Sequence, residues 1–134
     1  MAGYDVEINA PRFVPLDIKI RVCVAPGYFR VNVKQSLLRE LSTGVLPDGR
    51  LGVFHPDNLS LGQPLYLSRI YDAAMRVDGV ASIDVLKFQR WGHPAGQELA
   101  NGVIRTARLE ILRLDNDPNF PENGRLEFEM LGGL

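Results

Sequence analysis

The residues of this 134-residue chain best suited to metal binding are its two histidines, His55 and His93. Each directly precedes a proline, and they lie in two separate stretches rich in turn-forming residues. Zinc sites and metalloprotease motifs place their ligands at short fixed spacings, such as His-x-His or His-Glu-x-x-His, and neither histidine has such a neighbour. The spacing therefore predicts a turn or surface role for each histidine, with no metal and no cofactor.

An acidic stretch at Asp115, Asp117 and Asn119 has the spacing of the first ligands of a calcium-binding loop. That loop type needs a glycine at its sixth position and a glutamate at its twelfth, where this chain has Phe120 and Leu126. Asp and Asn side chains also form turns by accepting hydrogen bonds from nearby backbone N–H groups. We therefore expect a structural turn here and no calcium site.

The nucleophilic residue types are not set in catalytic motifs. No serine lies in a Gly-x-Ser-x-Gly sequence, and the glycines form neither a dinucleotide fingerprint nor a phosphate-binding loop. The single cysteine, Cys23, cannot form an internal disulfide and falls on the polar side of a predicted strand. The sequence predicts no catalytic residues and a protein that is not an enzyme, because catalysis would require groups to converge from distant segments.

Composition narrows the function classes further. The 15 Lys and Arg residues are balanced by 16 Asp and Glu residues, so no positive surface is expected for a nucleic acid. No apolar run approaches the roughly 20 residues that cross a bilayer, and the N-terminus lacks a signal-peptide pattern. With 46% hydrophobic residues, the chain can form a core. These features predict one soluble domain without nucleic-acid binding or membrane insertion.

The elements that would position any site begin with residues 14–24. There, apolar and other side chains alternate, which is the pattern of a strand with one buried and one exposed face. Two one-sided helices follow. The first is expected to start with a capping box from Asn32 to Gln35 and to stop at Gly44, and the second to run from Pro64 to a glycine cap at Gly79.

Three more strands complete the expected sheet: residues 80–91, then 109–114 and 125–131. In residues 80–91 the apolar pattern changes phase, which indicates a bulge or a strand partly covered on both faces. Glu127 and Glu129 of the last strand would pair with Lys19 and Arg21 if the first and last strands are neighbours. We therefore predict an α+β fold, a two-layer sandwich with a mostly antiparallel sheet of about four strands and two helices on one face. Residues 14–134 would form this domain, and residues 1–13 a lead-in from a preceding domain.

The stretch of residues 43–63 has no clear periodicity and exceeds the roughly 15 residues beyond which loops are usually functional or disordered. It is too apolar for a solvated tail, so we expect it to pack on its own domain or on a partner. Trp91, at a strand end, is the best candidate for an interface anchor. The candidate interface residues are Phe54, His55, Asp57, Asn58, Arg90 and Trp91. The alternative for the loop residues is a folded turn with Phe54 buried.

Four segments carry a resemblance to a known family: VPLDIKIRVCVAPGYF, LPDGRLGVFHPDNLSLGQPLYLSRIYDAAMRVDGV, VLKFQRWG and LEILRLDNDPNFPENGRLEFEM. In this order they resemble the C-terminal region of baseplate J-like proteins, in the group of baseplate assembly proteins from phage-like contractile tails. The resemblance covers the chain from about Tyr4 onward. Full members of the family extend far beyond this chain toward the N-terminus.

The resemblance implies a structural role, because these proteins are similar to the wedge subunits that surround a tail hub. Its implied partners are other baseplate wedge proteins and further copies of itself. Its implied location is the bacterial cytoplasm during assembly, and then the virion tail or injection particle. A rival interpretation is a receptor- or glycan-binding module at a tail tip, with the loop after Trp91 as its site.

Overall fold

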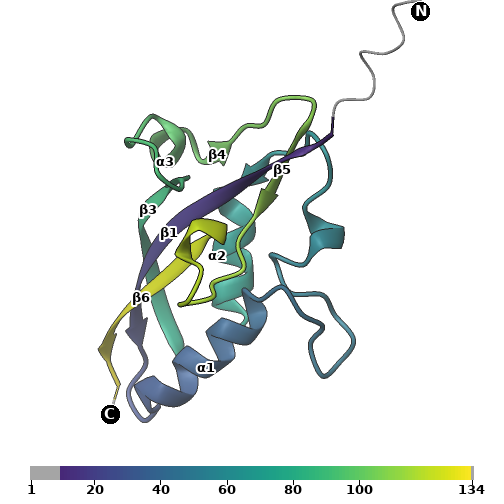
Figure 1. Cartoon of the computed structure of the whole chain (residues 1–134). Helices are drawn as coiled ribbons and strands as arrows, with labels where there is room; N and C mark the ends of the chain where they lie inside the picture. The colour runs from purple at the N-terminus through teal and green to yellow at the C-terminus, as the bar shows by residue number, and fades with distance from the viewer. Residues whose placement is uncertain (1–9, 134) are drawn as a thin grey trace, which may run out of the picture.

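The computed structural model describes residues 10–133 and shows a sheet built around one long central strand, β1 (Arg12–Val24). On one side β1 pairs antiparallel with β3 (Val80–Arg90). On the other side it pairs in parallel, first with β5 (Glu110–Arg113) and then with β6 (Arg125–Gly132). Figure 1 shows β5 and β6 following one another along the same edge of β1.

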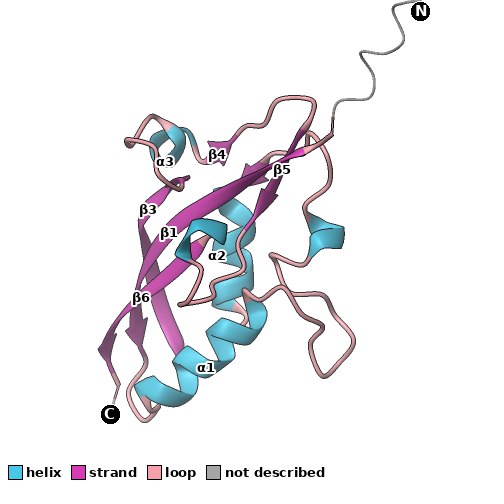
Figure 2. Cartoon of the chain, in the orientation of Figure 1, coloured by secondary structure: helices cyan, strands magenta, loops and turns pink. Residues whose placement is uncertain are grey.

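Helices cover one face of this sheet, so the expected α+β fold is confirmed. The two covering helices are α1 (Arg30–Glu40) and α2 (Leu67–Met75), as Figure 2 shows. A short third helix, α3 (Glu98–Asn101), has no buried residue and lies near the end of β3. A second, two-stranded sheet joins β2 (Leu65–Tyr66) to β4 (Val103–Ile104). Two turns of 3-10 helix, η2 (Pro56–Asn58) and η3 (Pro121–Asn123), lie in the longer loops.

The alternation in β1 does what its pattern predicts. From Val14 to Val24, its apolar side chains that face α1 and α2 are buried, whereas Phe13, Arg21 and Cys23 are exposed on the other, open face. The exception is Asp17, a carboxylate on the open face that is only 6% exposed. The main core residues of β1 are Leu16, Ile18, Ile20, Val22 and Val24.

Of the two explanations for the change of phase in the second long strand, a bulge or cover on both faces, the structure shows the bulge. Lys19 of β1 lies opposite Lys87, but Ile20 lies opposite Val85, so Leu86 is an extra residue in β3. This insertion explains the change of phase in the sequence, because a bulge lets a strand continue with its apolar side chains on the core face.

The prediction of a mostly antiparallel sheet is wrong, because two of the three pairings of β1 are parallel. The turn-rich residues 115–124 resemble a hairpin connection, yet they leave the edge of β1 and rejoin it. Asp115 N–H donates to Asn123 O and Asn116 N–H to Gly124 O, both at 3.1 Å, so the loop closes on itself. β6 therefore resumes the direction of β5 instead of reversing it.

Several predicted boundaries also differ. α1 has Phe29 as its N-cap residue and no side-chain capping bond, so the capping box is not formed. Pro64 precedes β2 and is not the first residue of α2, whose N-cap is Tyr66. β1 begins at Arg12, two residues inside the expected lead-in, while residues 1–9 of that lead-in lie outside the described part of the chain.

The first and last strands are neighbours, which is the condition on which the sequence predicted charge pairs between them. Arg21 lies opposite Glu129, and its Nε donates to Oε2 of that glutamate at 2.7 Å. The same contact lowers the pKa of the Glu129 carboxyl and raises the pKa of the guanidinium. Lys19 lies opposite Glu127 in the same register. Both partners of the Arg21–Glu129 pair are largely exposed, so the pair fixes register more than it adds stability.

Candidate functional site

His55 has the turn role that its sequence context predicts. It is the N-cap residue of η2, and its Nδ1 accepts a hydrogen bond from the Asp57 N–H at 3.0 Å. The other histidine, His93, is exposed in the loop after β3, where its carbonyl oxygen accepts from Gln89. Within residues 10–133, no group of three or more His, Cys, Asp and Glu side chains is arranged to hold a metal ion.

The acidic stretch after β5 is a structural turn. Asp117 Oδ1 accepts the Asn119 N–H at 3.0 Å, and Asp115 pairs with Arg113 at 2.6 Å. Asn116 adopts a positive φ of 54° and accepts the Leu126 N–H on its side-chain oxygen at 3.0 Å. These polar groups hold the loop between β5 and β6 in place, which agrees with the prediction made for Asp115, Asp117 and Asn119.

The loop candidates form a folded turn with Phe54 buried, which was the alternative to an interface. The Phe54 side chain is only 1% exposed and belongs to the core. Asn58 donates from Nδ2 to Gly52 O at 2.9 Å, which ties η2 to the preceding segment. Asp57 is the one fully exposed member of the group, whereas His55 is partly buried. The prediction that residues 43–63 form an ordered, packed loop is thus confirmed.

Arg90 is held by a carboxylate and does not project into solvent. Its two terminal nitrogens each lie 3.0 Å from an oxygen of Glu110, and one of them also donates to Arg105 O. Glu110 further accepts the Ala107 N–H at 2.7 Å. These donors, with Arg90 the strongest contributor, lower the pKa of Glu110 from 4.5 to about 2. The pair joins the end of β3 to the start of β5 and has a structural role.

Trp91 is partly buried on the open face of the sheet. The guanidinium of Arg125 lies 5.0 Å from the centre of the Trp91 ring, within cation–π distance. Arg125 also approaches Asp17, with Nε 3.6 Å from Oδ1. One face of the indole is therefore occupied by Arg125, whose guanidinium also lies beside the buried carboxylate of Asp17.

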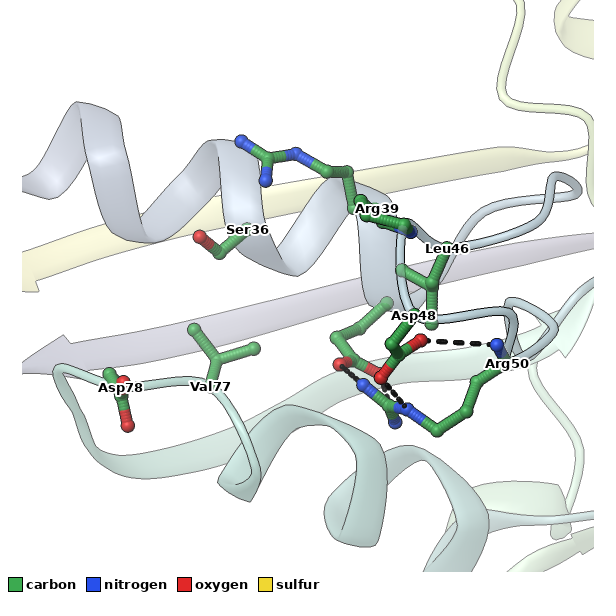
Figure 3. A pocket seen from close by; sticks show the side chains of 9 residues that line it. Ser36, Arg39, Leu46, Asp48, Arg50, Val77 and Asp78 are labelled. Carbon is green, nitrogen blue, oxygen red and sulfur yellow. Dashed lines mark hydrogen bonds and ion pairs between the residues drawn. The ribbon is translucent and has the colours of Figure 1, made fainter.

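A small polar cavity of about 300 Å³ lies between the end of α1 and the loop that follows it (Figure 3). Arg50 bridges the carboxylates of Glu40, at 2.9 Å, and Asp48, at 2.6 Å. Glu40 is 8% exposed and also lies 3.9 Å from Arg76. Figure 3 shows the Arg39 side chain pointing away from this cluster. The charges here neutralise one another and fasten the loop to α1.

A hollow of about 750 Å³ lies along the outer edge of β5, opposite β1. Figure 1 shows the loop of residues 54–62, in blue-teal, running beside β5. We name this hollow the β5 groove. It is lined by Phe13, Thr43, Phe54, Pro56, Leu59, Ser60, Leu61, Ile111, Leu112, Arg113 and Asp115.

The β5 groove combines a fixed wall with exposed apolar side chains. Phe54, Leu59 and Leu112 are buried core residues, so this wall is preformed. Phe13 is 58% exposed and Leu61 is 48% exposed, although both are large and apolar. The volume of about 750 Å³ and the mostly apolar lining, with few polar groups, fall in the range of ligand-binding pockets. The groove can accept apolar side chains, and the residues that line it offer no catalytic arrangement.

The two groups of candidate residues lie on either side of Phe13. Phe13 lines the β5 groove, together with Phe54, and also a smaller hollow that includes Arg90, Trp91 and His93. Sequence reasoning missed Phe13 because it assigned this residue to the lead-in. The alternation of β1 continued backward would have included it, since Phe13 lies on the side of β1 away from Val14.

No protein-family model matches this chain, and no curated protein sequence matches it significantly. Within residues 10–133, no helix is both long enough and apolar enough to cross a membrane.

Proposed function

We propose that this chain is a non-enzymatic structural domain of a phage-like contractile tail baseplate, and that it binds a neighbouring wedge protein through the β5 groove. The observation that carries the proposal is the groove itself, where exposed Phe13 and Leu61 flank a preformed apolar wall. Contiguous exposed apolar surface of this kind is typical of protein contact sites. The baseplate assignment rests on the sequence resemblance, carried by segments that include the FHPDN turn and the residues of β5.

The strongly held charges support a contact role over a chemical one. Arg90 and Glu110, like Arg50 and Glu40, are engaged with one another as parts of the scaffold. The polar side chains with the clearest electrostatic perturbation are thus already used for folding. By contrast, the exposed apolar side chains of the groove rim, Phe13 and Leu61, are available to pack against a second protein.

The rival function, glycan binding near Trp91, has weaker support. Glycan sites commonly use a free aromatic face, and Arg125 covers one face of the Trp91 ring. The hollow beside Trp91 is also smaller, at about 240 Å³.

The test is to measure association of the purified chain with the baseplate proteins encoded beside it, by light scattering and calorimetry. Leu61→Asp should weaken the association about fivefold or more, since an important apolar interface contact is worth over about 1 kcal/mol. Val45→Asp is the matched control, because Val45 is 62% exposed, lies in the same long loop and does not line the groove.

An equal loss in the two variants, or no association with any neighbouring baseplate protein, would contradict the proposal. Binding of the chain to a sugar array, lost in Trp91→Ala and retained in Leu61→Asp, would establish the rival function.

A further inference from the structure

The floor of the β5 groove is the outer backbone edge of a strand. Arg12 N–H donates to Leu109 O on the β1 side, whereas Glu110 O points outward and accepts the Gly62 N–H at 2.8 Å. Because backbone groups alternate along a strand, the N–H and C=O of Leu112 point outward as well. In the described part of the chain, the sheet pairings of β5 are with β1 alone. The outer edge at Leu112 is therefore placed to receive another strand.

Side chains on both faces of this edge would pack against an added strand. Phe13 and Ile111 are register partners on the open face, whereas Leu112 and Leu59 lie on the core side. An added strand would direct alternate side chains to these two sides. The groove thus fits a short extended segment whose side chains alternate, which is the mode of β-strand addition.

The sequence contains such a segment just before β1. Residues 4–9 read Tyr-Asp-Val-Glu-Ile-Asn, with apolar and polar side chains in strict alternation, and lie outside the described residues. Its two carboxylates match the charge near the start of β5. There Arg12 has a side chain that is 73% exposed, and Arg108 is exposed beside Gly62. Shape and charge both favour this segment as the occupant of the groove.

The chain just before β1 is poorly suited to fold back into its own groove. To place residues 4–8 in the groove of the same molecule, the backbone would have to turn back and cross β5 between residue 8 and Arg12, the first residue of β1. Pro11 pushes Ala10 toward extended conformations and is disfavoured at the third position of a type I turn. This proline therefore disfavours insertion of residues 4–8 into the groove of the same molecule and favours insertion into a second copy.

We propose that residues 4–8 of one copy of this chain add as a strand to the outer edge of β5 in a second copy. This inference rests on the proposed function, because it names one partner of the same groove. The groove is incomplete in a single copy, and strand exchange between copies completes it. Successive copies would then be linked head to tail by their lead-ins.

The test uses disulfide formation between two pools of the full chain, both carrying Cys23→Ser to remove the exposed native thiol. One pool carries Leu61→Cys. The other carries Val6→Cys, Glu7→Cys or Ile8→Cys, so that both faces of the strand and a shift of register are covered. Mixing under mild oxidation should give cross-linked pairs about tenfold faster than mixing with a Val45→Cys pool, because pairing raises the effective concentration of the thiols.

Each outcome decides the inference. Faster cross-linking between the pools supports it. A control chain carries Leu61→Cys together with one of the three lead-in substitutions and is oxidised at high dilution. If this chain cross-links within itself and the mixed pools do not cross-link, the inference is overturned, because the segment would then occupy its own groove. Equal rates with Leu61→Cys and Val45→Cys also overturn it. If the cross-linking fails but a wedge protein still binds in a Leu61-dependent way, the proposed function stands and the strand exchange is refuted. If the cross-linking succeeds but no wedge protein binds, the proposed function alone is refuted.

Discussion

The first residue of β5 and the residues after it lie in opposite kinds of surroundings. Glu110 is surrounded by donors from Arg90 and Ala107, and its carbonyl oxygen accepts from Gly62. Two residues later, the outer edge of the strand faces an apolar hollow rimmed by exposed Phe13 and Leu61. In this domain, the charged groups with shifted pKa values hold the fold together, whereas the exposed apolar side chains line the contact surface that we propose.

The sharpest test of this division is Phe54, which lies in the groove wall but is 1% exposed. Phe54→Ala should lower the free energy of unfolding by about 3–5 kcal/mol, the usual cost of removing a buried aromatic ring. Urea denaturation followed by circular dichroism measures this loss. A change below about 1 kcal/mol would move Phe54 from the scaffold to the contact surface.

Arg90→Ala should have the next largest effect, a loss of about 2 kcal/mol, because it removes charged hydrogen bonds to a carboxylate of which only a tenth is exposed. Arg12→Ala is the matched control, since Arg12 lies 3.5 Å from the same carboxylate but is 73% exposed. Equal losses of unfolding free energy in the two variants would show that the two hydrogen bonds from Arg90 to Glu110 contribute no more than an exposed charge.

The pH dependence of stability isolates the carboxylate side of that pair. The pKa of Glu110 is lowered from 4.5 to about 2, so its stabilising contribution is complete above pH 4.5 and is lost as the pH falls toward 2. Glu110→Gln should therefore show a shallower decline in unfolding free energy between pH 4.5 and 2 than the parent chain. Parallel curves for the two chains would contradict the structural role assigned to Glu110.

Leu61→Asp should have the smallest effect on stability, within about 0.5 kcal/mol, because Leu61 is 48% exposed. The same variant is expected to weaken association, and that contrast separates contact from scaffold. Thermal unfolding followed by circular dichroism measures the stability term. A loss comparable to that of Phe54→Ala would make Leu61 part of the core.

The sequence was most informative where one periodic signal determines one structural outcome. Alternation predicted β1 and its buried face. The broken phase around Leu86 indicated either a bulge or cover on both faces, and the structure shows the bulge in β3. The direction of the last strands was not predictable in this way. Turn-forming residues 115–124 indicate a loop, but the edge of β1 to which the chain returns depends on long-range pairing.

The candidate site was predicted only in part, for a related physical reason. The long apolar loop was expected to pack, and it forms one wall of the groove. The other wall comes from β5 and Phe13, which are distant from that loop in sequence. Polarity and aromatic content favoured Arg90 and Trp91, whose side chains are occupied by Glu110 and Arg125. Local sequence does not reveal which polar side chains already have partners.

The self-closing loop between β5 and β6 has a practical consequence. Hydrogen bonds from Asp115 and Asn116 to Asn123 and Gly124 hold its two ends together. A longer segment between these ends would therefore not change the strand pairing of the sheet. Phe120 is exposed within that segment. A fluorescent reporter or an epitope tag inserted there would be displayed on the surface while β6 keeps its register, giving a way to follow the domain in an assembled particle.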